Sequence, residues 1–238
     1  ALMDQAVAAT QTEAEKERVR LFKVGIWDYM VEGRAAYEEH QRAQAEPPVT
    51  VELARLPEKL QGDPDRVNWD EARNVGGWGG LSGDKVDRRL QTLAAQDGEH
   101  LYIELSEWID PKRLVSGGQV WDGDDFEIII AAQRGATQRH QLAVAPDGSS
   151  VGLAWEGQEL ADWTSGAVVR SDTKQPDRWV ARVALPLDKI LPGGWKPGLS
   201  VYLNCYAARP GTSELLAWQP VFASGFHSTE RLPEWVLK

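Results

Sequence analysis

Residues 101–106 read LYIELS and residues 179–185 read WVARVAL, and these two stretches decide the fold class. In the first, Leu101, Ile103 and Leu105 alternate with tyrosine, glutamate and serine. The second stretch alternates in the same way. Successive side chains of a β-strand point to opposite faces of a sheet, so this period of two predicts strands with a buried face.

Short apolar runs of this kind recur from residue 49 onward, separated by turn sequences such as Pro146-Asp147-Gly148. The predicted strands are Val49–Leu53, Leu90–Ala94, Leu101–Trp108, Phe126–Ala132, Gln138–Ala145, Val151–Trp155, Ala167–Arg170, Trp179–Leu185, Leu199–Ala207, Leu215–Gln219 and Glu234–Leu237. No helical pattern lies between them. The sequence therefore predicts an all-β domain over residues 47–238, a jelly-roll-like β-sandwich or a barrel.

Residues 1–46 follow a different pattern, with no proline and only two of the 22 glycines. Val19, Phe22, Ile26 and Tyr29 recur at steps of three and four, which is the spacing of one helical face. We expect a long amphipathic α-helix, broken near Thr10–Thr12 and ending before the two prolines that follow. This helical segment could be the tail of a domain upstream.

Charge and hydropathy exclude several classes of partner. The chain carries 26 Lys and Arg against 36 Asp and Glu, a net charge of −10. Phosphate backbones are bound by clustered cations, so nucleic acid is not an expected partner, and anionic membrane surfaces would repel the chain. No apolar run approaches the roughly 20 residues that span a bilayer.

The sequence offers little for common enzyme chemistry. We find no HExxH, no G-x-S-x-G, no phosphate-binding loop and no dinucleotide fingerprint. The single cysteine, Cys205, has no partner for an internal disulfide and is expected to be a small buried residue. The 11 tryptophans, against 4 Phe and 5 Tyr, indicate either a tryptophan-rich core or platforms for stacking.

Seven short motifs, in order over residues 60–238, resemble those of the family 9 carbohydrate-binding modules. They are GDP at 62–64 with WDEA at 69–72, DGEHLYI at 97–103, VWDGDDFEI at 120–128, VAPDG at 144–148, WVARVALPL at 179–187, LAWQP at 216–220 and FHSTERL at 226–232. Residues 1–46 are outside this resemblance.

The resemblance implies a β-sandwich that binds sugar, often the end of a glycan chain, between two aromatic rings. Trp121 matches one of these rings, and Phe226 matches the position of the second. Glu127 matches a position that accepts hydroxyl protons, and His227 would supply a further hydrogen bond. The expected ligand is a plant-type polysaccharide or oligosaccharide, whose C–H faces stack on aromatic rings.

The chain departs from the family pattern at two polar positions, which are Ala143 and Ala145 here. Arg139 and Arg231 are nearby in sequence and could replace the missing polar groups. Trp78 lies among four glycines, so its ring is expected either to pack or to contact ligand.

Acidic side chains raise the question of a metal. Asp122 and Asp124 lie in an oxygen-rich turn and, with Asp110, could hold a structural Ca²⁺. The alternative is a solvated turn. No cofactor is expected to be required.

Carboxylates could also form a hydrolytic pair, since glycosidases place two of them roughly 5–9 Å apart. The candidates are Glu104, Asp125 and Glu127 on neighbouring predicted strands.

These observations predict a non-catalytic carbohydrate-binding module that targets an attached glycan-processing enzyme to polysaccharide. We expect a fragment of a multidomain bacterial protein, extracellular or periplasmic. Two alternatives stay open. One is a protein-interaction sandwich that has lost the sugar site, and the other is a glycoside hydrolase.

Overall fold

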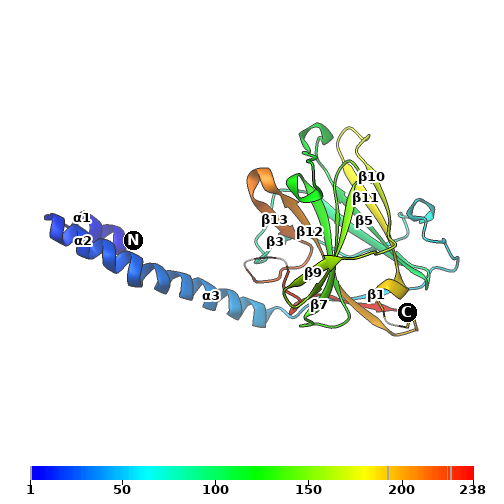
Figure 1. The fold of residues 1–238 in the computed structure, drawn as a ribbon, viewed down its shortest axis with the longest axis horizontal. Coiled ribbons are helices and arrows are strands. Elements are labelled where there is room, and N and C mark those ends of the chain that lie inside the picture. The colour runs from blue at the N-terminus through cyan, green and yellow to red at the C-terminus, as the bar shows by residue number, and fades with distance from the viewer. Residues whose placement is uncertain (1, 192, 224, 226) are drawn as a thin grey trace. The chain divides into compact units, whose positions relative to one another are not determined.

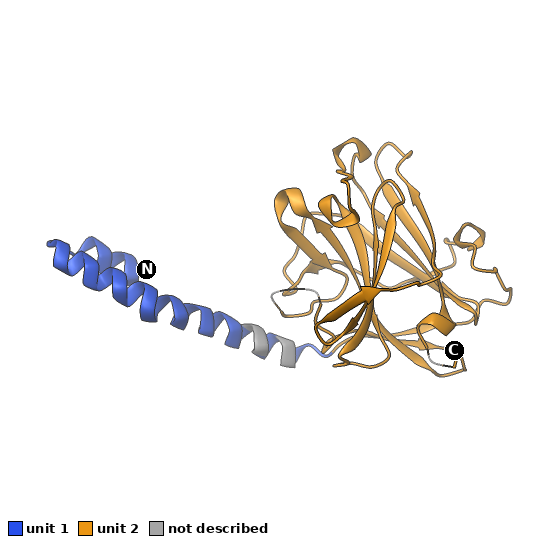
Figure 2. Cartoon of the chain, in the orientation of Figure 1, with its two compact units in different colours: residues 1–47 blue, residues 48–238 orange. Residues whose placement is uncertain are grey.

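The computed structural model describes residues 2–191, 193–223, 225 and 227–238, with the side chains of 39, 40, 43 and 44 excepted. The chain divides into two compact units, residues 1–47 and 48–238 (Figure 2).

The first unit is helical. It contains α1 (Leu2–Ala8), α2 (Glu13–Phe22), a π-helical segment (Lys23–Trp27) and α3 (Asp28–Ala45). The break predicted near Thr10–Thr12 is confirmed, because Thr12 forms the N-cap of α2. Its hydroxyl accepts a hydrogen bond from the Glu15 amide at 3.2 Å, and the Glu15 carboxylate accepts one from the Thr12 amide at 2.9 Å.

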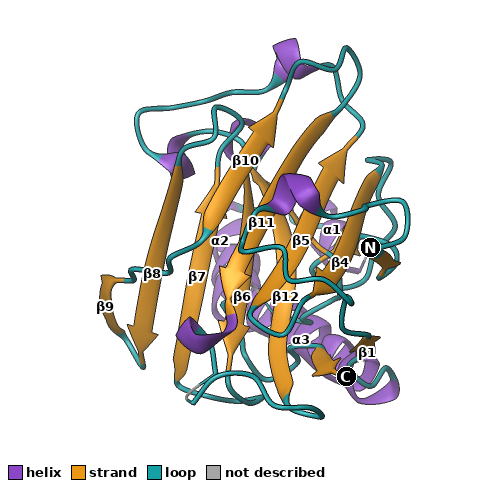
Figure 3. Cartoon of the chain, turned by 90° about the vertical axis from the view of Figure 1, so that its right-hand side faces the viewer, coloured by secondary structure: helices purple, strands orange, loops and turns teal. Residues whose placement is uncertain are grey.

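The second unit is a sandwich of two sheets (Figures 1 and 3). One sheet has nine strands, in the order β1-β14-β12-β6-β7-β8-β9, with β13 pairing β12 and β3 pairing β13. The other has five strands, in the order β10-β11-β5-β4-β2. The strands are β1 (Thr50–Leu53), β2 (Arg73–Asn74), β3 (Gly79–Gly80), β4 (Leu90–Gln96), β5 (His100–Glu107), β6 (Asp125–Ala131), β7 (Gln138–Val144), β8 (Ser150–Glu156), β9 (Glu159–Asp162), β10 (Val168–Asp172), β11 (Trp179–Pro186), β12 (Ser200–Arg209), β13 (Glu214–Ala217) and β14 (Glu234–Leu237).

All eleven predicted strands are present, and the predicted all-β sandwich is confirmed. The sequence analysis missed β2, β3 and β9. The first two are only two residues long, and every residue of β9 is exposed, so none of them carries an alternating apolar pattern.

The core lies between the two sheets and contains the residues that the alternation selects. Leu101, Ile103 and Leu105 of β5 are fully buried there. Phe126 of β6 stacks on Trp179 of β11, with ring centroids 4.1 Å apart and planes at 21°. Cys205 is also buried in this core, as predicted.

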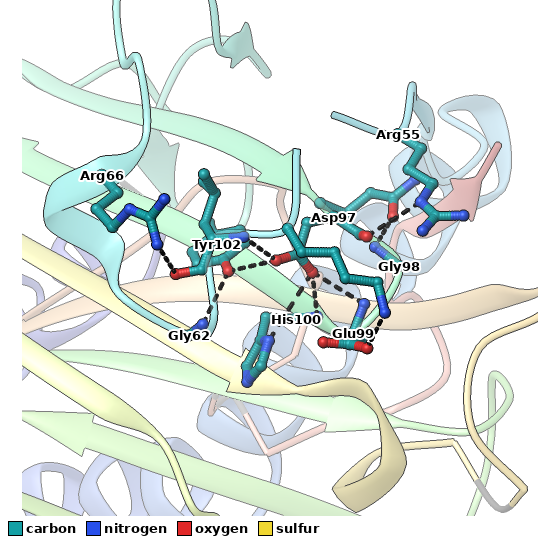
Figure 4. Close-up of polar contacts among 11 residues, drawn as sticks. Arg55, Gly62, Arg66, Asp97, Gly98, Glu99, His100 and Tyr102 are labelled. Carbon is teal, nitrogen blue, oxygen red and sulfur yellow. Dashed lines mark hydrogen bonds and ion pairs between the residues drawn. The ribbon is translucent and has the colours of Figure 1, made fainter. Parts of the chain in front are cut away.

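Two motifs that carry the sequence resemblance meet in one polar cluster (Figure 4). Asp97 lies in the turn between β4 and β5 and is fully buried. Its carboxylate accepts hydrogen bonds from the amides of Leu60, Glu99 and His100 at 2.9, 2.9 and 2.8 Å and from the Tyr102 hydroxyl at 2.7 Å.

The same cluster explains the glycine of the first motif. The Tyr102 hydroxyl accepts a hydrogen bond from the Gly62 amide at 3.2 Å. Gly62 has φ +72°, and a Cβ there would lie 2.8 Å from Nε2 of His100. These motif residues therefore hold the loop before β2 onto the β4–β5 turn.

None of the described helices is both long and apolar enough to cross a membrane.

Candidate functional site

The outward face of the nine-stranded sheet, the face turned away from the core, carries a hydrogen-bonded row across three strands. Glu127 lies on β6, Gln141 on β7 and Trp155 on β8. Nε1 of Trp155 donates to Oε1 of Gln141 at 3.1 Å. The amide nitrogen of Gln141 in turn donates to the Glu127 carboxylate. The row fixes an indole ring at the sheet surface.

Two further side chains lie against this ring. Arg139 is paired with Trp155 in the β7–β8 register, and its Cζ lies 4.6 Å from the ring centroid. The ring of His227 has its centroid 5.3 Å from that of Trp155, with planes at 40°. We call Glu127, Gln141, Arg139, Trp155 and His227 the Trp155 cluster.

The surroundings of His227 in the cluster affect its pKa. Burial lowers the pKa of His227, and the positive charge of Arg139 lowers it further. His227 is therefore neutral at pH 7 and offers one donor and one acceptor nitrogen. A partly exposed aromatic ring, a guanidinium and a neutral imidazole thus share one patch of surface.

Glu127 and Asp125 lie two residues apart on the outward face of β6 and are each 1% exposed. Burial raises the pKa of Glu127 to about 7, although Gln141 and Trp121 act in the opposite direction. Burial, followed by the charges of Glu127 and Asp124, raises the pKa of Asp125 to about 8. These two carboxyl groups therefore hold protons near neutral pH.

Trp121 lies in a 3₁₀ turn, Val120–Asp122, just before β6. Its half-buried ring packs against a small apolar cluster of Val120, Ala143 and Ala145. The two positions at which the chain departs from the family pattern thus belong to the apolar surface on which Trp121 rests.

Among the described residues, Trp78 and Arg231 contact other rings than Trp155. Trp78 packs against the core between the sheets, with its ring centroid 6.4 Å from that of Phe126. Its Nε1 donates to Oγ1 of Thr92 at 3.1 Å. Phe226 lies outside the described residues. Arg231 places its guanidinium over the Phe222 ring, with Cζ 4.9 Å from the centroid.

The expected calcium ligands are not assembled. Asp110 accepts from the Lys112 amide and Asp122 from the Gln119 amide, so each closes its own turn. Asp124 accepts from the Val115 amide and lies 3.4 Å from Nε of Arg209. In the described part of the chain, no three His, Cys, Asp or Glu side chains form a group that could hold a metal ion. The geometry therefore does not support a calcium site on these aspartates.

The candidate hydrolytic carboxylates are not a pair either. Glu104 is paired with Arg182 on the outward face of the five-stranded sheet, whereas Glu127 lies on the outward face of the other sheet. The core separates them. Asp125 and Glu127 share a face, but both are too buried for a substrate to reach.

Sequence reasoning missed Trp155 and Gln141. Residues 151–155 were recognised as a strand, but the strand pattern does not reveal which neighbour pairs with it. The register that sets Trp155 opposite Arg139 comes from the fold. A signal was present in the polar residues 138–141 at the start of an otherwise apolar predicted strand.

A hollow of about 370 Å³ lies beside the cluster at the β7–β8–β9 end of the sheet. Its lining includes Arg139, Trp155, Glu156 and Leu160. The cluster is therefore bordered by open space.

No protein-family model and no curated protein sequence matches the chain. Solved structures do. A Bacteroides uniformis protein whose suggested role is carbohydrate binding superimposes with a TM-score of 0.59 at 11% identity, covering 81% of this chain and all of that one. A family 9 carbohydrate-binding module from Caldicellulosiruptor kristjanssonii, solved with cellotriose, gives a TM-score of 0.58 at 10% identity and covers 79% of this chain and 93% of its own.

The sandwich has the family 9 module fold. A second structure of the Caldicellulosiruptor kristjanssonii module, with glucose, matches with a TM-score of 0.58 at 9% identity. The resemblance drawn from the seven motifs is thus confirmed for the fold. In this family 9 fold, two of those motifs build the Asp97 cluster, and VWDGDDFEI supplies Trp121 and Glu127.

Proposed function

We propose that the sandwich is a non-catalytic carbohydrate-binding module whose ligand binds on the outward face of the nine-stranded sheet. The observation that carries this proposal is the Trp155 ring, which is partly exposed, fixed by Gln141 and flanked by Arg139 and His227. The family 9 fold supports it, since modules of that fold have been solved with cellotriose and with glucose.

The chemistry of the cluster suits a sugar. A pyranose presents C–H groups on its face, which stack on an indole ring, and hydroxyl groups at its edge. Arg139 offers N–H donors, and neutral His227 offers a donor and an acceptor. Because Gln141 anchors Nε1 of Trp155, the ring is held in place before ligand arrives, which lowers the entropic cost of binding.

In the longer protein, we propose that such a module holds an attached glycan-processing enzyme near its polysaccharide outside the cytoplasm. The physical benefit is a raised effective concentration of substrate at the catalytic domain. Trp121, at the Val120–Asp122 turn beside Glu127, is the second aromatic element of the proposed site.

The test is calorimetry and affinity electrophoresis with cellotriose, xylan, β-glucan and pectin, using wild type and Trp155→Ala. We expect saturable binding to at least one ligand and a loss of at least about 10-fold in Trp155→Ala, since a stacked aromatic contributes on the order of 1–3 kcal/mol. Trp195→Ala is the matched control, because Trp195 is a partly buried tryptophan that lies under Arg55 instead, with Cζ 5.0 Å from the ring centroid.

Binding that survives in Trp155→Ala would place the sugar elsewhere. Silence across the panel would overturn the proposal and favour a protein-interaction role. One observation supports that second candidate: Phe22, Ile26 and Tyr29 of the helical unit are 45, 49 and 70% exposed, as an assembly surface would require.

A further inference from the structure

A second groove crosses the outward face of the five-stranded sheet, on the other side of the core from the Trp155 cluster. It has a volume of about 350 Å³. Its lining includes Trp69, Asn74, Gln91, Glu104, Arg178 and Arg182, which we call the Trp69 groove. The floor follows the strand register, since Glu104 of β5 lies between Arg182 of β11 and Leu93 of β4.

The aromatic wall of the groove is fixed. Nε1 of Trp69 donates to the Pro64 carbonyl at 3.0 Å, and one part of the ring packs against the apolar cluster that contains Leu60 and Val67. Cζ of Arg182 lies 5.8 Å from the ring centroid. The rest of the indole is open to the groove, because Trp69 is only partly buried.

An ion pair between Glu104 and Arg182 forms the floor of the groove. Glu104 is 5% exposed, and its Oε2 accepts a hydrogen bond from Nε of Arg182 at 2.7 Å. The hydroxyl of Ser106 donates to Oε1 of Glu104 at 3.3 Å, and Nη1 of Arg182 lies 3.5 Å from Asp65. The buried Glu104 carboxylate holds the partly exposed Arg182 guanidinium in one geometry, so this floor is preorganised.

Arg178 differs from Arg182. Its Nε donates to the neutral amide oxygen of Gln175 at 3.1 Å, and its Cζ lies 5.6 Å from the Trp108 ring centroid. Among the described residues, no carboxylate lies within ion-pair distance of Arg178. Its guanidinium therefore brings to the groove a positive charge that is not held in an ion pair, although the lining also includes the carboxylate of Asp70.

We propose that the Trp69 groove binds a sugar chain that carries carboxylates, that is, a uronate oligosaccharide. Trp69 would stack on the pyranose ring, and Arg178 would bind the carboxylate through its terminal N–H groups. The amides of Gln91 and Asn74 supply the polar partners for hydroxyl groups. Oδ1 of Asn74 accepts from the Gly76 amide at 3.0 Å, which directs its NH₂ group away from that turn.

The groove has room for more than one sugar residue. An adjacent hollow of about 450 Å³ shares Ala72 and Asn74 with it and is lined by Arg55 and Arg73 as well. A chain that continued from Arg178 past Asn74 would meet these two arginines together with Glu52 and Glu71, which line the same hollow. The inference goes beyond the proposed function, because it assigns a second ligand class to the opposite face.

The test is titration calorimetry with trigalacturonic acid and with cellotriose, on wild type, Arg178→Gln and Trp155→Ala. We expect trigalacturonic acid to bind wild type and Trp155→Ala equally, and to bind Arg178→Gln at least about 10-fold more weakly, because the charge-assisted hydrogen bonds to its carboxylate are lost. Raising the salt concentration should weaken this binding but not that of cellotriose. Arg113→Gln, a change to an exposed arginine outside the groove, is the control.

Each outcome decides between the two faces. Equal binding of trigalacturonic acid by wild type and Arg178→Gln would overturn the inference, as would its loss in Trp155→Ala or its failure to bind folded wild type. Failure of cellotriose, xylan and β-glucan to bind, with trigalacturonic acid still bound, would count against the proposed function alone and leave the inference about the Trp69 groove unaffected. A thermal melt of each variant shows whether it is folded.

Discussion

Asp97 and Glu127 are both buried carboxylates, yet their surroundings shift their pKa values in opposite directions. Burial acts to raise the pKa of Asp97, but the Tyr102 hydroxyl and three backbone amides outweigh it, so the pKa lies below its ordinary value. Glu127 accepts a hydrogen bond from the Gln141 amide group, and burial raises its pKa to about 7. Asp97 is therefore ionised at neutral pH, whereas Glu127 titrates there.

The difference separates a fully satisfied carboxylate from one that is only partly satisfied, and neither is open to a ligand, since Glu127 is 1% exposed. Four protein donors satisfy Asp97, and its partners join two loops, so nothing remains for a ligand to supply. Glu127 lies under an aromatic surface and has hydrogen-bonding capacity left. Both belong to motifs of the same family resemblance, and the count of donors tells them apart.

The largest expected effect comes from removing the structural carboxylate. Asp97→Ala should lower the free energy of unfolding by about 3 kcal/mol, because buried donors lose their acceptor. Urea unfolding measures it. Tyr102→Phe, which removes one of the four donors and the bridge to Gly62, should cost only about 1 kcal/mol. If Asp97→Ala lowered the free energy of unfolding no more than Tyr102→Phe does, Asp97 would not be the acceptor that holds the two loops together.

The second prediction concerns how the free energy of unfolding changes with pH because of Glu127. The unfolded chain releases the proton of Glu127 near pH 4, whereas the folded chain keeps it to about pH 7, so this group lowers stability as pH rises between those values. Glu127→Gln should therefore be more stable than wild type by up to about 3 kcal/mol at pH 8 and equal to it near pH 4. Urea unfolding at both pH values measures the difference.

For Asp97, the stability that its carboxylate contributes should depend on pH in the opposite direction, and Asp97→Asn tests this. Its folded pKa is lowered, so the stability that ionised Asp97 contributes is present above about pH 4 and lost as pH falls below it. The cost of Asp97→Asn should shrink towards low pH. The same pH trend in both variants would mean that the two carboxylates do not differ as described.

The smallest effect comes from the link between Glu127 and the indole ring. Gln141→Leu removes the hydrogen bond that opposes the rise in the pKa of Glu127, so that pKa should increase further, by less than about 1 unit. NMR titration of the Glu127 carboxyl carbon measures it. The indole N–H resonance of Trp155 should move too, because its acceptor is lost. The Asp97 carboxyl resonance serves as the internal control, and a fall in the Glu127 pKa would refute the link.

Much of the fold could be predicted because its determinants are local. Alternation over residues 101–106 depends only on neighbours along one strand, and the buried face of β5 is the one that it selected. The capping residue Thr12 and the prolines after residue 46 act within a single turn. Short or fully exposed strands such as β9 gave no such signal, since their pairing partners alone define them.

The candidate site was predicted only in part, because it depends on register. Motif comparison selected Glu127 and His227, and proximity in sequence selected Arg139. Neither selected the Trp155 ring, which brings Arg139 and His227 together, or the Gln141 amide, which links that ring to Glu127. The expected calcium ligands, though close in sequence, each close a separate backbone contact. The proposed carboxylate partners Glu104 and Glu127 proved to face opposite sides of the sandwich.

The class of fold and eleven of its strands follow from local patterns along the chain, because alternation and turn residues act over a few positions. Which side chains meet depends on how the strands pair and pack. Strand pairing set Trp155 opposite Arg139 and Glu104 opposite Arg182, and packing determined which carboxylates are satisfied and which still hold protons. Register and burial depend on contacts between distant segments, and the pattern of a single strand does not contain them.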